Sequence, residues 1–343
     1  MGDRSLAERL ALARLALDGL SLGDAFGESF FVSDAAQRVR AQRLAPAPWR
    51  WTDDTAMAIG IVETLAAGRG IDQDELARRF AARYVAEPGR GYGPAMHGAL
   101  GDIHAGRHWR PISYGQFSGR GSYGNGAAMR APVIGAWFAD DLDEVVRAAR
   151  LSAEVTHASP EAAAGAVAVA LAAALACHGE EGPAGSVLIA AVLDRLPDTD
   201  VGRGSQRALA LEPDATIEEA VDALGNGTQI SCQDTVPLVL WCAAHQLHDY
   251  RRALWRTVSA LGDRDTTCAM VGGIVACRVG REGLPADWLA CREPLPAIRP
   301  SARPALSPSQ GPNVAAPTSP PDRPGERPRA PGATPTLTQG QTP

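Results

Sequence analysis

The sequence of 343 residues contains no lysine, so all 33 of its basic residues are arginine. It also lacks a basic excess: 39 acidic residues give a net charge of −6, which argues against a nucleic-acid-binding surface. Aromatic residues make up only 5% of the chain, and its six cysteines form no CxxC pair. Because the N-terminus has no secretion signal, such scattered cysteines predict reduced thiols in a cytoplasmic protein.

No uninterrupted apolar run is long enough to make a convincing membrane span. The longest, residues 162–177, consists almost entirely of alanine, valine, leucine and glycine. Its length predicts a buried core helix. The first 20 residues interleave acids and arginines with leucines, which indicates an amphipathic helix and excludes a signal peptide. We therefore expect no membrane partner.

The C-terminus differs in composition from the rest of the chain. From Pro300 to Pro343, 12 of 44 residues are proline, and no aromatic residue follows Trp288. Such a segment buries too little apolar surface to offset the entropy lost on ordering. We predict one domain over residues 1–297 and a disordered Pro-rich tail over residues 298–343.

The body of the chain shows the periodicity of helices. Apolar residues recur at spacings of three and four, and no stretch alternates as a strand would. The predicted helical segments are residues 6–17, 56–67, 74–84, 142–151, 159–177, 186–196, 217–224, 235–245, 250–260 and 266–278. The glycine-rich segments between them, predicted as loops, are residues 22–29, 88–93, 115–126 and 225–227. The pattern predicts an all-α domain with its chemistry on loops.

Two short acidic segments stand directly before predicted helices: TDDT at residues 52–55 and DRDT at residues 263–266. For either segment alone, helix capping by the Thr and Asp side chains is the plainer interpretation. Two such segments far apart in the chain instead suggest one shared site, where clustered carboxylates would require cations. Ligands that are all oxygen indicate a hard ion, Mg²⁺, Mn²⁺ or Ca²⁺.

Three glycine-rich segments are candidates for phosphate binding: GDAFGE at 23–28, GRGYGP at 89–94 and GSYGNGAAMR at 121–130. Glycine lets backbone N–H groups approach phosphate oxygens closely, and Tyr92 and Tyr123 are suited to flank a ribose or base. Each segment alone also fits an ordinary turn. None matches a P-loop or a dinucleotide-binding fingerprint.

Taken in order, the motifs GDAFG, WTDDT, GYG, GNGAAMR, TH before a helix, and GDRDTT resemble the ADP-ribosylglycohydrolase family. This family includes dinitrogenase-reductase-activating glycohydrolase and the ADP-ribosylhydrolases. The resemblance covers residues 15–280 and implies a compact orthogonal helical bundle. It also implies an enzyme that hydrolyses the ribosyl C1″ bond of an ADP-ribosylated protein or small molecule. Nucleic acid would enter only as an ADP-ribosylated substrate, and we expect a monomer.

The resemblance also implies roles for particular residues. Two divalent cations, Mg²⁺ or Mn²⁺, would be held by Thr52, Asp53, Asp54, Asp263, Asp265 and Thr266. The substrate would lie against Gly91, Tyr92, Gly93, Gly121, Ser122, Tyr123, Asn125 and His157, with its diphosphate along residues 91–93 and its adenosine near His157. The cations would lower the pKa of a bound water. The candidate catalytic carboxylates are Asp53, Asp54 and Glu28, of which Asp54 or Glu28 would move the proton.

Two positions depart from the family pattern. Phe31 stands where many members carry a glutamate, seven residues after Asp24, so either Glu28 supplies that carboxylate or the role is missing. Arg264 separates the last two aspartates, and its charge either competes with a cation or contacts a substrate phosphate. The alternative functions are a non-catalytic ADP-ribose-binding or structural relative, and a hydrolase of free ADP-ribosyl compounds or nucleosides.

Overall fold

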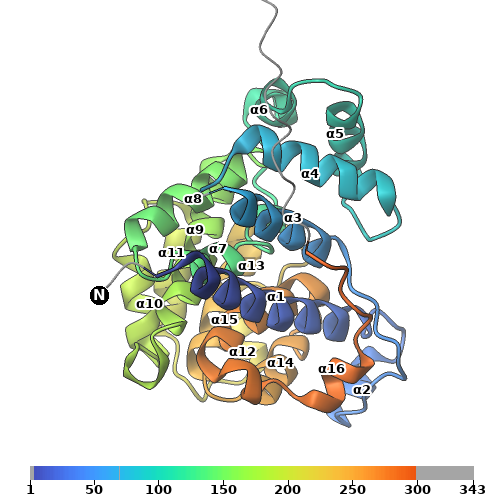
Figure 1. Cartoon of the computed structure of the whole chain (residues 1–343). Helices are drawn as coiled ribbons and strands as arrows, with labels where there is room; N and C mark the ends of the chain where they lie inside the picture. The colour runs from blue at the N-terminus through green and yellow to red at the C-terminus, as the bar shows by residue number, and fades with distance from the viewer. Residues whose placement is uncertain (1–3, 69, 299–343) are drawn as a thin grey trace, which may run out of the picture. The chain divides into compact units, whose positions relative to one another are not determined.

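The computed structural model describes residues 4–68 and 70–298, and in these residues helices are the sole regular elements (Figure 1). The helices are α1 (Leu6–Glu28), α2 (Ala35–Arg40), α3 (Asp53–Ala67), α4 (Gln73–Ala86), α5 (Pro94–His104), α6 (Trp109–Gly119), α7 (Pro132–Trp137), α8 (Leu142–Glu154), α9 (Pro160–Ala176), α10 (Gly185–Leu193), α11 (Asp200–Ala210), α12 (Ile217–Leu224), α13 (Cys232–His245), α14 (Tyr250–Val258), α15 (Arg264–Gly283) and α16 (Ala286–Cys291). Short 3₁₀ turns lie at Asn125–Ala127 and Gly179–Glu181. The all-α prediction is confirmed. The predicted tail lies outside the described residues, apart from Ile298.

Each segment predicted from periodicity lies on a helix of the structure. The helices that periodicity missed are α2, α5, α6, α7, α11 and α16. Of these, α2, α7 and α16 have six residues each, and α6 is interrupted at Gln116–Ser118. The predicted loop over residues 22–29 is wrong, because α1 continues as a helix to Glu28. Glycine destabilises an isolated helix, but here it is the residue that lets a second helix approach.

The long helices α1 and α15 pack with their backbones in contact. Gly19, Gly23 and Gly27 lie one turn apart on the face of α1 that meets α15. A Cβ atom on Gly23 would lie 2.0 Å from the carbonyl oxygen of Cys268, and one on Gly27 would lie 2.1 Å from that of Arg264. Glycine is therefore required along this stripe. The contact brings the end of α1 against the start of α15. In Figure 1 the two helices lie next to each other.

The alanine-rich run predicted as a core helix is α9, and nearly all of its residues are buried. Ser159 caps it by accepting the N–H of Glu161, and Pro160 occupies its first turn. The helix packs against α7, α8, α13 and α15. The core-helix prediction is confirmed. Among residues 4–68 and 70–298, no helix combines the length and apolar character that a membrane crossing requires.

All six cysteines lie among the described residues, and none of them is in a disulfide. The four that are buried are Cys232, Cys242, Cys268 and Cys277. Buried free thiols pack as small apolar groups. The expectation of unpaired cysteines is thus confirmed.

Candidate active site

The two acidic segments lie at one cavity of about 410 Å³. Asp53, at the start of α3, lines it together with Asp263 and Asp265 at the start of α15. Thr266 also lines the cavity, and its hydroxyl donates across 3.4 Å to Oδ2 of Asp54, which lies behind the wall. Four carboxyl groups that are about 210 positions apart in the sequence, two in each acidic segment, therefore lie close together in the fold.

Asp24 of α1 fixes the first acidic segment. Its buried carboxylate accepts the backbone N–H groups of Thr52 at 2.9 Å and Thr55 at 3.2 Å, and also both threonine hydroxyls. Such N–H groups have no partner within the helix itself. Asp24 therefore caps α3 from a neighbouring helix, and Thr52 makes no side-chain cap. Capping does not account for Asp53 and Asp54, and Asp24 was missing from the predicted site.

The second acidic segment is held from the glycine-rich segment at residues 121–130. Asn125 donates its side-chain amide to Oδ2 of Asp263 across 2.7 Å and to the Thr235 hydroxyl across 3.2 Å. Asp263 begins α15 without capping it. Asp265 does accept a nearby amide, the N–H of Thr266 at 2.8 Å. The capping interpretation thus applies to Asp265 alone.

Four acids of this region, Asp24, Asp53, Asp54 and Asp263, hold their protons more tightly than ordinary carboxyls because their pKa values are raised. Burial, reinforced by the charge of Asp265, raises the pKa of Asp53 to about 8 and that of Asp263 to about 8. Burial raises the pKa of Asp24 to about 7, and burial with the neighbouring acids raises that of Asp54 well above its usual range. Full ionisation of this cluster therefore requires a nearby positive charge.

The rest of the cavity wall comes from the glycine-rich segments and from residues that sequence reasoning missed. Of the predicted substrate-binding residues, those lining it are Gly91, Gly93, Ser122, Tyr123, Asn125 and His157. The lining residues outside the predicted site are Met57, Pro94, Ala95, Met96, Phe117, Gly124, Gly126, Met129, Gln229 and Ile230. Of these, Pro94, Gly124, Gly126 and Met129 belong to the glycine-rich segments singled out from the sequence. Phe117 and Ile230 are 52% and 64% exposed and have left-handed backbones, with φ of 50° and 52°. Large apolar side chains in that conformation are uncommon, so these two loops hold them at the cavity under strain.

The other predicted residues lie behind the cavity wall or beside it. Thr52 and Asp54 are buried beneath Asp53, and Tyr92 turns its ring edge-on to Tyr84 at 5.1 Å. The Tyr92 hydroxyl has no hydrogen-bond partner. A Cβ on Gly121 would lie 2.5 Å from the Ala158 carbonyl, so this glycine permits a close backbone contact.

His157 is buried beneath the glycine-rich segment, and a Cβ on Gly126 would come within 2.8 Å of its ring. Nδ1 lies 2.7 Å from the Thr156 hydroxyl. Burial, with the charge of Arg130, lowers the pKa of His157 to about 3, so the ring is neutral at physiological pH. Arg130 donates to the Ser152 carbonyl and the Thr156 hydroxyl, which agrees with a supporting role.

The two positions that depart from the family pattern contact each other. Arg264 donates to the carbonyls of Phe30 at 2.9 Å and Leu261 at 2.8 Å, and its guanidinium lies 4.7 Å from the centre of the Phe31 ring. The Arg264 guanidinium is thus directed at the end of α1. This matches neither of the two predictions, which were competition with a cation and contact with a substrate phosphate. Glu28 is half-buried, and burial and Asp265 raise its pKa.

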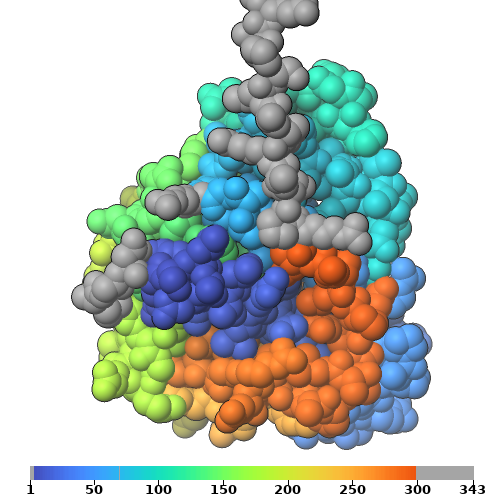
Figure 2. All heavy atoms as spheres, in the orientation of Figure 1, coloured from blue at the N-terminus to red at the C-terminus, as the bar shows by residue number. Residues whose placement is uncertain are grey.

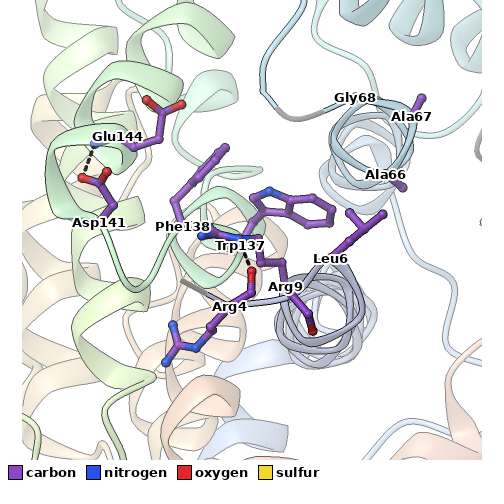
Figure 3. A pocket seen from close by; sticks show the side chains of 11 residues that line it. Arg4, Leu6, Arg9, Ala66, Ala67, Gly68, Trp137, Phe138, Asp141 and Glu144 are labelled. Carbon is purple, nitrogen blue, oxygen red and sulfur yellow. Dashed lines mark hydrogen bonds between the residues drawn. The ribbon is translucent and has the colours of Figure 1, made fainter. Parts of the chain in front are cut away.

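A separate hollow of about 690 Å³ lies between the start of α1, the end of α3 and the start of α8 (Figure 3). Its charged lining residues are Arg4, Arg9, Asp141 and Glu144. Asp141 is occupied in capping α8, where it accepts the N–H of Glu144 at 3.0 Å. This hollow contains none of the predicted site residues. The smaller cavity, which Asp53, Asp263 and Asp265 line, is therefore the candidate active site.

Comparison with known proteins agrees with this fold and site. The model of the ADP-ribosylglycohydrolase family matches residues 5–307, and the chain belongs to this family of glycosidic-bond hydrolases. It is 32% identical over 332 residues to ADP-ribosylhydrolase ARH3 of Bos taurus, covering 84% of this chain and 90% of that protein. The human ARH3 is 32% identical over 327 residues, covering 82% and 89%. A solved ADP-ribosylglycohydrolase-related protein complex shares the fold, with a TM-score of 0.58, 23% identity, and coverage of 84% and 94%.

Proposed function

We propose that this protein releases ADP-ribose from a modified acceptor by hydrolysing the N- or O-glycosidic bond at ribosyl C1″, with the help of two divalent cations. The observation that carries the proposal is the cavity with three aspartates, Asp53, Asp263 and Asp265, on its wall and glycine-rich segments around it. The similarity to ADP-ribosylhydrolases supports the choice of substrate.

The donor groups fit hard cations. Oδ1 of Asp54 is buried without a hydrogen-bond partner, and burial among neighbouring acids raises the pKa of Asp53 and Asp54, which a bound cation would offset. Among the described residues, no three His, Cys, Asp or Glu side chains are grouped to hold one ion by themselves. This agrees with Mg²⁺, which is usually bound through one or two carboxylates and keeps several waters. The proposed ligands are Thr52, Asp53, Asp54, Asp263, Asp265 and Thr266.

When bound, such cations orient ribose hydroxyls and acidify a water molecule near neutral pH. The residues of the chain would do the rest of the positioning. Gly91 and Gly93 offer backbone that a diphosphate can approach, and Gly91 has the left-handed φ of 92° that favours glycine. At the other side of the cavity the rings of Phe117 and Tyr123 lie 5.8 Å apart and present apolar faces to an adenine.

Neither of the two carboxyls proposed to move the proton lines the cavity, and Glu28 is the more exposed of the two. Oδ2 of Asp54 already accepts the hydroxyls of Thr52 and Thr266, and the side chain is buried. Glu28 is half-buried, and burial together with the charge of Asp265 raises its pKa above the ordinary value. A carboxyl of this kind can protonate the leaving group as the C1″ bond breaks.

The proposed function is tested by a release assay with ADP-ribose linked separately to arginine, to serine, to a nucleic-acid base and to a terminal phosphate. We expect ADP-ribose release from at least one linkage with Mg²⁺ or Mn²⁺. Binding of ADP-ribose without release from any linkage would favour a non-catalytic relative. Release from free ADP-ribosyl compounds alone would favour the small-molecule hydrolase.

Stabilisation by cations is expected to increase with pH. The folded carboxyls keep their protons up to about pH 8, whereas unfolded ones lose them near pH 4, so the cation-free protein loses stability as pH rises through this interval. Cations bind the deprotonated form and oppose this loss. Mn²⁺ at a hundredfold excess over its Kd should add about 2.7 kcal/mol to the free energy of unfolding at pH 8, and much less at pH 5.5.

This expectation is checked by thermal unfolding with and without Mn²⁺ across the pH range. Because each pH is measured with and without Mn²⁺, titrations that Mn²⁺ does not perturb cancel, and the difference reports on the groups linked to cation binding. The Asp265→Ala variant is the control and should lose the pH-dependent gain. Equal stabilisation of the wild-type protein at pH 5.5 and pH 8 would contradict the proposed ligands.

A further inference from the structure

We propose that Glu293, in the segment that follows α16, is a positioning residue for the active site and acts through Arg90. The inference rests on the proposed function in one respect, that residues 52–54 and 91–93 act together on cations and substrate. Glu293 itself is not on the cavity wall. Its effect is to hold these two segments of the site in register.

Arg90 is the centre of this arrangement, and it is buried. Its five N–H donors make five hydrogen bonds: two to each of the Glu87 and Glu293 carboxylates and one to the Trp51 carbonyl. The guanidinium also lies 3.4 Å from the centre of the Trp51 ring. A planar fork bound in this way has one orientation, unlike a lysine ammonium.

The backbone of Arg90 connects the two segments of the site. Its carbonyl accepts the N–H of Asp53 at 2.7 Å, and the next residue, Gly91, would place a Cβ 3.5 Å from Oδ1 of Asp53. Any shift of Arg90 is therefore passed to the Asp53 carboxylate and to the glycine segment at once. Both are parts of the proposed cation and diphosphate site.

Glu293 reaches Arg90 because the C-terminal segment lies beside the segment that leads into α3. Trp49 donates its N–H to the Cys291 carbonyl at 2.7 Å, and Glu293 donates its own to the Trp49 carbonyl at 2.8 Å. In Figure 2 the orange C-terminal residues border the dark-blue residues of α1, on the same face of the molecule. The Glu293 carboxylate then binds Arg90 with both oxygens, at 2.6 and 2.9 Å.

The two glutamates that bind Arg90 differ in which segments of the chain they connect to it. Glu87 is three residues from Arg90, is 51% exposed, and restrains only its own loop. Glu293 is separated from Arg90 by 203 positions and is 30% exposed, so its carboxylate joins distant parts of the chain. Loss of Glu293 therefore releases a connection between segments, whereas loss of Glu87 does not.

The test compares the full-length variants Glu293→Ala, Glu293→Gln and Glu87→Gln with the wild-type protein. Mn²⁺ and ADP-ribose affinities are measured by calorimetry, and KM and kcat by ADP-ribose release. The control is Glu144→Ala, which removes a glutamate of similar exposure, 23%, that pairs with Arg147 on α8. Residues that orient metal ligands typically contribute about 10–100-fold to metal affinity or activity.

We expect Glu293→Ala to weaken Mn²⁺ binding and raise KM by about tenfold each, with kcat changed much less. Glu293→Gln, which keeps one acceptor oxygen, should restore part of the loss, and Glu87→Gln and Glu144→Ala should stay near wild type. Wild-type Mn²⁺ affinity, ADP-ribose affinity and KM in both Glu293 variants would overturn the inference. If the wild-type protein binds both ligands but releases no ADP-ribose, the proposed function fails, and the two affinities still decide the role of Glu293.

Discussion

Replacing Asp53 with alanine is expected to lower metal-dependent ADP-ribose release by about a thousandfold or more, with the helical fold retained. A cation at a reacting centre contributes several kcal/mol to transition-state stabilisation, and each 1.36 kcal/mol is tenfold in rate. Asp53 lies on the cavity wall, and its N–H is bonded to Arg90 of the neighbouring glycine-rich segment, so its loss would remove one of the proposed cation ligands. Asp265→Ala should have a comparable effect for the same reason.

The same substitution should not destabilise the protein when cations are absent. Asp53 is half-buried among like charges, and its raised pKa means that its ionised form is disfavoured there. Removing it relieves repulsion on Asp54 and Asp263. At pH 8 without cations, the thermal midpoint of Asp53→Ala should therefore equal or exceed that of the wild-type protein.

The measurements are single-turnover release in Mg²⁺ and Mn²⁺, far-ultraviolet circular dichroism, and thermal unfolding. Asp222→Ala is a suitable control, because Asp222 is an exposed acid on α12 that does not line the cavity. Wild-type turnover in both Asp53→Ala and Asp265→Ala would show that the acids are not the cation ligands. A collapsed helical signal in either variant would point instead to a structural role.

Replacing Gly23 with alanine should give the largest loss of stability among conservative substitutions in α1. The added methyl would lie 2.0 Å from the Cys268 carbonyl oxygen and 2.7 Å from its carbon, both of which belong to the backbone of α15. A helix backbone cannot rotate away as a side chain can, so α1 and α15 must separate. Overpacking typically costs about 1–3 kcal/mol, and we expect a loss at or above the upper end of this range.

Chemical denaturation measures this loss as a fall in the free energy of unfolding. Gly98→Ala in α5 is the matched control: Gly98 is exposed, and a Cβ there would meet nothing within 4 Å. Alanine is the better helix former, so Gly98→Ala should gain roughly 0.5–1 kcal/mol. If Gly23→Ala proved as stable as the wild-type protein, the two helices could not be in backbone contact at this point.

Local sequence patterns were sufficient for those parts of the fold that follow from periodicity. The helices α3, α9 and α13 were predicted because each buries most of its length, and their apolar runs show it. The end of α1 was predicted wrongly as a loop. Glycine has a low helix propensity, so Gly23 and Gly27 favoured a loop in the prediction. Their place in the helix is explained by the backbone of α15, which is distant in the sequence and leaves no room for a Cβ atom.

In the candidate site, too, some features follow from the local sequence and others depend on contacts between distant segments. The acids of TDDT and DRDT were identified from the chemistry of clustered carboxylates, without knowledge of their distance. Phe117 and Ile230 were missed because their exposure and left-handed backbones depend on how two loops meet at the cavity. The pairing of Arg90 with Glu293 likewise has no local signal, since charged residues separated by 203 positions pair only in the folded chain.

The packing of α1 against α15 also dictates when this enzyme can become active. The Arg264 guanidinium donates a hydrogen bond to the Phe30 carbonyl, and these two residues are separated by 234 positions in the chain. At about 5–20 residues per second, a ribosome needs roughly 10–50 s to make the intervening polypeptide. Throughout that interval the glycine stripe of α1 has no partner, and the acids of α3 have no counterparts. A nascent chain therefore completes the proposed cation site only after almost the whole domain has emerged.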